Sequence, residues 1–193
     1  MTPSQLYRLT SFVGLTCTAI LVFNSARKGG LVPDITLTRA VAPLGALTGL
    51  FALTGIYLWQ RAETGVLGLV GYALNAAGLA GAFAIEYTLQ YVFAYLPKGE
   101  VTALVDGAPG KAFTVTAVVL IAGALTFGAA MWRARRFPPA AVALYAIGMV
   151  PGSLRNVVPV GVYLAGLLAA AAGVAWLSLT LLRQRKVSPV FAE

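Results

Sequence analysis

The chain has 193 residues, of which 59% are hydrophobic and only 10% are charged, and its formal net charge is +8. Soluble domains carry about 25% charged residues, so this composition excludes an ordinary soluble protein and predicts an integral membrane protein. The basic clusters "RARR" (133–136) and "RQRK" (183–186) end long apolar runs. This placement favours anchors near anionic headgroups and predicts no nucleic-acid partner.

The charged residues divide the chain into long uncharged runs, and a transmembrane helix needs about 20 apolar residues. The first run, 9–26, is followed by a poor cleavage site and is interpreted as a retained helix, not a signal peptide. The last run, 137–182, is too long for one helix and divides at "VPGSLRNVVPVG", where two prolines indicate a turn. We therefore predict six transmembrane helices, near 8–26, 40–60, 65–95, 112–132, 138–154 and 159–183.

The predicted fold class is all-α: a polytopic membrane protein, a six-transmembrane-helix bundle with short loops, forming a single domain over 1–193. The third helix is expected to project beyond the bilayer, because about 30 residues span roughly 45 Å. Small residues such as those of "GALTG" (45–49) predict close helix packing and leave oligomerisation through small-residue helix faces open.

Six helices place both termini on one side of the membrane. That side holds eight Lys and Arg residues and the other side holds six, which by the positive-inside rule predicts cytoplasmic termini in a bacterial-type inner or plasma membrane. The alternation of loops also brings a set of polar residues to the non-cytoplasmic end of the bundle. These are Asn24, Arg27, Asp34, Glu86, Gln90, Arg155 and Asn156.

Glu86 is the single charge in the run 64–97 and is the candidate catalytic residue. Asn75, three helical turns earlier, and Gln90, one turn later, are predicted to share its helix face. A carboxylate within a membrane is by default a candidate functional group. The alternative is a structural ion pair with Arg155 or Arg27 near the headgroups.

Aromatic residues recur at every fourth position beside Glu86. Phe83, Tyr87, Tyr91 and Tyr95 are predicted to form a ridge on the helix. The ridge suits either an interfacial aromatic belt and helix packing or, for its deeper members, a ligand pocket. Arg155 has two interpretations as well: it ends a helical hairpin, or it binds an anion.

Several chemistries are excluded by what the sequence lacks. The chain has no histidine and one cysteine, so the usual zinc, haem and catalytic-triad sites are not predicted, and neither a metal nor a cofactor is expected. No phosphate-binding loop or dinucleotide-binding glycine motif is present either.

Three functions remain in competition. The first is a protein that handles a lipid-like or isoprenoid molecule around Glu86, for example a cyclase or isomerase in which a carboxyl group is the general acid and aromatic faces stabilise a carbocation. The second is a small transporter or channel with Glu86 as a proton- or cation-responsive site, and the third is a structural or regulatory membrane subunit. The expected partners are membrane lipids and a hydrophobic small-molecule ligand. Its candidate contacts are Asn75, Phe83, Tyr87, Gln90, Tyr91, Arg155, Asn156, Asn24, Arg27 and Asp34.

Overall fold

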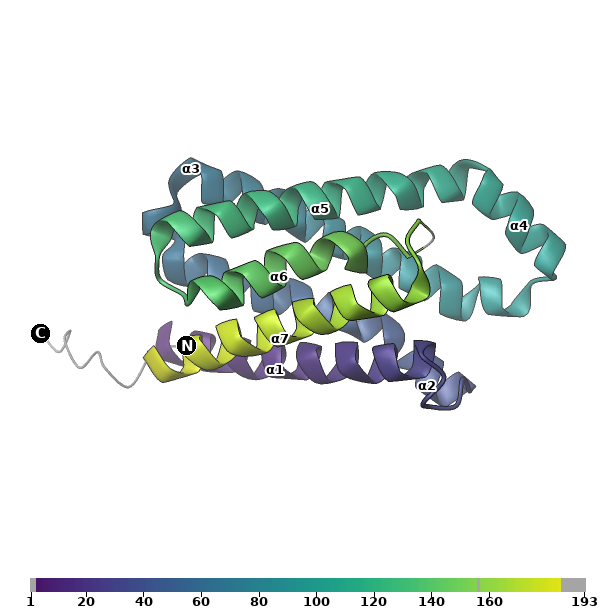
Figure 1. Ribbon diagram of the computed structural model, residues 1–193, viewed down its shortest axis with the longest axis horizontal. Coiled ribbons are helices and arrows are strands. Elements are labelled where there is room, and N and C mark those ends of the chain that lie inside the picture. Colours follow the sequence, from purple (N-terminus) through teal and green to yellow (C-terminus); the bar gives the residue numbers. More distant parts are fainter. Residues whose placement is uncertain (1–2, 156, 185–193) are drawn as a thin grey trace, which may run out of the picture.

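The computed structural model describes residues 3–155 and 157–184, and these fold into a bundle of helices that run roughly parallel or antiparallel to one another (Figure 1). The all-α prediction is confirmed. The elements in chain order are α1 (Pro3–Lys28), α2 (Thr36–Ala40), α3 (Ala42–Tyr91), the 3-10 turn η1 (Phe93–Tyr95), α4 (Lys98–Asp106), α5 (Ala108–Ala134), α6 (Pro139–Gly152) and α7 (Val160–Gln184).

Within the described residues, four stretches are long and apolar enough to cross a membrane: those over α1, α3, α5 and α7. This is consistent with an integral, multi-pass membrane protein. The apolar helix α6 is shorter, at 14 residues. Its 14 residues cover about 21 Å at 1.5 Å per residue, less than the hydrocarbon core of a typical bilayer.

α3 reverses direction at Gly65. This glycine has φ 55° and ψ −148°, outside the helical region, and it separates a first half (42–64) from a second half (66–91). The two halves lie side by side, because the rings of Tyr57 and Tyr72 stack with centroids 4.5 Å apart, and Thr54 Oγ1 is 3.1 Å from the Tyr72 hydroxyl. The halves correspond to the predicted helices 40–60 and 65–95.

Replacing Gly65 with alanine is expected to lower the free energy of unfolding by about 1–3 kcal/mol, because its backbone conformation is essentially restricted to glycine. No atom lies within 4 Å of a Cβ built there, so the loss would come from the backbone alone. The measurement is SDS-induced unfolding of the purified protein in detergent. Gly99→Ala is the control, since Gly99 also has open space around it. Equal stability of the two variants would contradict the reversal at Gly65.

The predicted loop between the third and fourth helices contains a helix instead. The second half of α3 ends at Tyr91, and η1 and α4 connect it to α5. The α-helix thus ends four residues before the predicted boundary at 95, a 3-10 turn follows it, and the projection of this segment beyond the bilayer stays a prediction. Pro97 precedes α4 with an extended ψ of 143°, which ends the preceding turn and starts a new helix direction. The short helix α2 likewise lies in the segment predicted as a loop between the first two helices.

Glycines bring α3 and α5 into close contact, as their small-residue pattern predicts. A Cβ at Gly71 would lie 2.5 Å from the backbone nitrogen of Phe127, and one at Gly123 would overlap the backbone of Asn75. Gly45 and Gly49 of "GALTG" face α1, next to Ile20 and Cys17. These small-residue faces pack within the chain.

The bundle closes on itself because its first and last helices are neighbours. The Thr18 hydroxyl of α1 donates a hydrogen bond to the carbonyl of Ala171 in α7, at 3.2 Å. Gly14 in α1 also faces Ser178 in α7. Figure 1 shows α1 and α7 side by side and antiparallel, with the start of α1 and the end of α7 at the same end of the bundle. The helices therefore form a ring around a common interior.

Candidate functional site

The interior of this ring contains an elongated, largely apolar cavity of about 150 Å³. Its wall receives residues from α1, both halves of α3, α5, α6 and α7. Along α7 the wall runs from Tyr163 to Leu177, a distance of about 21 Å at 1.5 Å per residue. Apolar side chains such as Leu53, Phe127 and Met131 line its deeper part.

Four polar residues line the end of the cavity near the α1–α2 turn: Asn24, Lys28, Glu86 and Tyr163, here called the polar cluster. The Lys28 ammonium donates to Glu86 Oε1 at 2.7 Å and to the Tyr163 hydroxyl at 2.8 Å. Only 13% of the Lys28 side chain and 20% of the Glu86 side chain are exposed. The cluster thus holds a partly buried, charge-balanced ion pair at the head of an apolar cavity.

Gln90 supports the carboxylate from one turn further along α3. Its side-chain amide donates to Glu86 Oε2 at 3.2 Å. Both Glu86 oxygens therefore accept hydrogen bonds, one from a cation. The predicted pairing of Glu86 and Gln90 on one face is seen in this contact.

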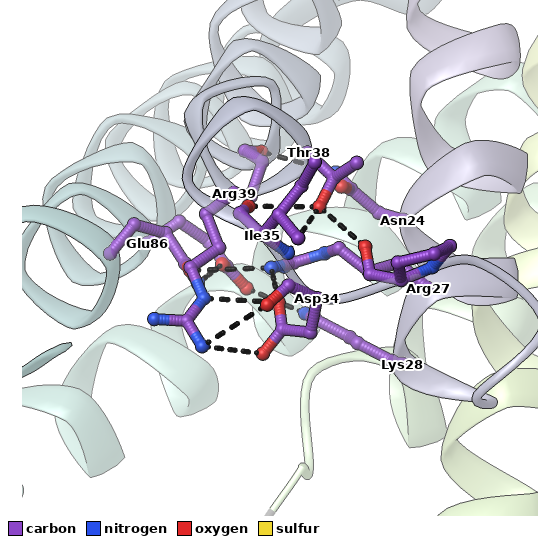
Figure 2. A network of polar contacts seen from close by, with 11 residues as sticks. Asn24, Arg27, Lys28, Asp34, Ile35, Thr38, Arg39 and Glu86 are labelled. Atoms are coloured by element: carbon purple, nitrogen blue, oxygen red, sulfur yellow. Dashed lines mark hydrogen bonds and ion pairs between the residues drawn. The ribbon is translucent and has the colours of Figure 1, made fainter.

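A second ion-pair network lies beside the polar cluster, toward the α1–α2 turn (Figure 2). Asp34 accepts from Arg27 at 2.7 Å and from Arg39 at 2.9 Å. The hydrogen-bonded Arg39 guanidinium, with a smaller contribution from Arg27, lowers the pKa of the Asp34 carboxyl below its ordinary value. Arg27 also reaches Gln90 Oε1 at 3.4 Å. The network thus ties the end of α1 to α2 and to the second half of α3.

The other polar residues predicted to contact a ligand do not line the cavity among the described residues. Arg155 is exposed at the same end of the bundle, close enough for its charge to act on Glu86. Asn156 lies outside the described residues. Asn75 is fully buried further along α3, and its amide donates to the hydroxyl of Tyr145 in α6. Eleven residues from Glu86, it lies about 16 Å away along the helix and is not among the described residues that line the cavity.

The aromatic ridge lies on the outside of the bundle. The rings of Phe83 and Tyr87 are 6.2 Å apart and those of Tyr87 and Tyr91 are 4.8 Å apart. Tyr87, Tyr91 and Tyr95 are exposed, and Tyr91 donates to the carbonyl of Ala40 at 3.4 Å. None of the four is among the described residues that line the cavity.

Lys28 and Tyr163 were not singled out from the sequence. A signal for Lys28 was present, since it follows Asn24 by four residues and so shares its face of α1. Tyr163 carries no such signal, because its place depends on how α7 packs against α1.

Comparisons with known proteins add no assignment to this geometry. No protein-family model matches the chain, and no curated protein or solved structure matches it either.

Proposed function

We propose that the protein binds one lipid-like molecule inside its helical bundle, with an apolar chain in the cavity and a polar head at the polar cluster. The observation that supports this most is that the polar cluster and the apolar side chains line the same cavity. An apolar cavity of about 150 Å³ is large enough to bind a small hydrocarbon such as benzene. A partly buried ion pair at its end can orient the head of a ligand.

The geometry of Glu86 favours binding over acid catalysis. A general acid must carry a proton, whereas the Glu86 oxygens accept from Lys28 and Gln90. The aromatic ridge that was expected to stabilise a carbocation beside Glu86 is not among the described residues that line the cavity. The ligand-handling function is therefore proposed without a cyclase step.

The binding proposal is tested with Ala170→Leu, which adds bulk to the cavity wall. Ala170 lines the cavity and is 1% exposed. Protein purified in detergent would be extracted with solvent, and the co-purifying lipids would be measured by mass spectrometry. We expect a stoichiometric compound in wild-type protein that is reduced at least severalfold in the variant.

The control is Ala172→Leu, which makes the same change at an exposed position of the same helix. It should retain the compound at the wild-type level. Equal extracts from all three proteins, each folded by thermal melting, would contradict binding in the cavity.

We further propose that the two halves of α3 and helices α1, α5, α6 and α7 make six membrane crossings with cytoplasmic termini, in a bacterial-type inner or plasma membrane. The eight-to-six distribution of Lys and Arg supports this orientation. Buried Cys17 should give little background in cysteine labelling. In intact cells an impermeant thiol reagent should label Val157→Cys and Gly99→Cys but not Arg135→Cys. Labelling of positions 135 and 157 from the same side would show that α6 does not cross.

A further inference from the structure

We infer that the head of the bound molecule is an uncharged hydroxyl group, so that the ligand class is a slender long-chain or isoprenoid alcohol. This inference rests on the proposed function and names its ligand. It rests on hydrogen-bond donors and one acceptor of the polar cluster that have no partner among the described residues.

Asn24 supplies the acceptor. Its side-chain amide nitrogen donates to the carbonyl of Ala42 at 3.3 Å, which fixes the orientation of the group. Its Oδ1 atom is buried and has no hydrogen-bond partner among the described residues. Asn24 is 5% exposed and lines the cavity. A buried acceptor without a donor is costly, so a ligand that donates a hydrogen bond here is favoured.

Lys28 and Tyr163 supply the donors. An ammonium group has three protons, and Lys28 uses one for Glu86 and one for Tyr163. The Tyr163 hydroxyl accepts from Lys28 and retains its own proton for donation. Asn24 and Lys28 are four residues apart and lie on one face of α1. Asn24, Lys28 and Tyr163 all line the cavity, so its polar cluster offers both an acceptor and donors.

The pairing of the polar groups favours a neutral hydroxyl over a carboxylate. Lys28 already has Glu86 as its counter-ion, and Arg27 and Arg39 share Asp34 outside the cavity wall. A carboxylate head would lie beside the Glu86 carboxylate, at a lysine that is already paired, and would bring no donor for the unpartnered Asn24 oxygen. A hydroxyl donates once and accepts from Lys28 or Tyr163.

The shape of the cavity selects a slender chain. A cavity of about 150 Å³ whose wall follows α7 for about 21 Å favours a single extended chain over a bulky ring system. Ten-carbon compounds are suitable probes, since an extended chain advances about 1.2 Å per bond and ten carbons cover about half of that length.

The test measures direct retention of four radiolabelled probes by immobilised protein in detergent: decan-1-ol, decanoate, decyl phosphate and decane. We expect decan-1-ol to bind about tenfold more tightly than each of the others, the effect of one good hydrogen bond to a buried group. Asn24→Leu should remove this preference while leaving decane binding unchanged. Thr16→Val, at an exposed position of α1, is the control and should keep the preference.

The outcomes separate the two proposals. Tighter binding of decanoate or decyl phosphate, or equal binding of all four probes, would overturn the hydroxyl ligand while leaving the cavity as a lipid site. Retention of none of the probes by wild-type protein would contradict the proposed function itself. An unchanged preference in Asn24→Leu would overturn the role of Asn24.

Discussion

Replacing Glu86 with glutamine is expected to lower the free energy of unfolding by about 3 kcal/mol. The change leaves the charge of Lys28 largely buried without its counter-ion, and breaking a buried ion pair is strongly destabilising. The amide keeps the size of the side chain, so the loss would come from charge and not from packing. SDS titration of the purified protein provides the measurement.

A double-mutant cycle with Lys28→Met isolates the ion pair. We expect the double variant to recover a large part of the stability lost in Glu86→Gln, with a coupling of about 2 kcal/mol, because no unpaired charge remains. Strictly additive losses would contradict a direct pair. Unchanged stability of Glu86→Gln together with loss of ligand retention would instead place the carboxylate in ligand contact.

Replacing Gly123 with alanine is expected to cost about 1–3 kcal/mol, the range for overpacking a closely packed interface. A Cβ at this position would overlap the backbone of Asn75, so α3 and α5 would have to separate. The displacement would also weaken the hydrogen bond from Asn75 to Tyr145. Thermal melting in detergent, together with SDS titration, measures the loss.

The matched control is Gly161→Ala in α7. Nothing lies within 4 Å of a Cβ at Gly161, and the residue is exposed. Alanine is the better helix former, so this variant should be as stable as wild type or slightly more stable. Equal effects at Gly123 and Gly161 would show that α3 and α5 do not approach each other at this point.

Much of the helical arrangement could be predicted from the spacing of charges. Each predicted helix boundary agrees with the structure to within five residues, and the largest difference is the start of the first helix, predicted near 8 and observed at Pro3. The short helices α2 and α4 were missed, since few residues carry their pattern and their positions depend on neighbouring helices. The reversal at Gly65 was placed correctly, although its connection by a single residue depends on a backbone conformation that a sequence pattern does not reveal.

The sequence predicted which residues lie at the same end of the bundle, but not which side of each helix faces the cavity. Loop alternation and helix rise brought Asn24, Arg27, Asp34, Glu86 and Gln90 to one end of the bundle, where the structure also has them. Which residue pairs with Glu86 depends on the rotation of α1 about its axis, which the sequence does not give. In the structure the partner is Lys28, and not Arg27 or Arg155. The aromatic ridge was correctly placed beside Glu86, but which side of α3 faces the interior follows from the glycines that contact α5.

Because α7 is the last helix of the bundle and packs against α1, the cavity wall is completed only when the end of the chain is in place. The hydrogen bond from Thr18 to Ala171 joins positions 153 residues apart, so it can form only after α7 has been synthesised. A nascent chain that has not yet reached residue 160 lacks one wall of the cavity and has an open groove between α1 and α6. The site therefore comes into existence only with the insertion of the final helix, and truncation before α7 would leave a groove exposed to lipid in place of an enclosed site.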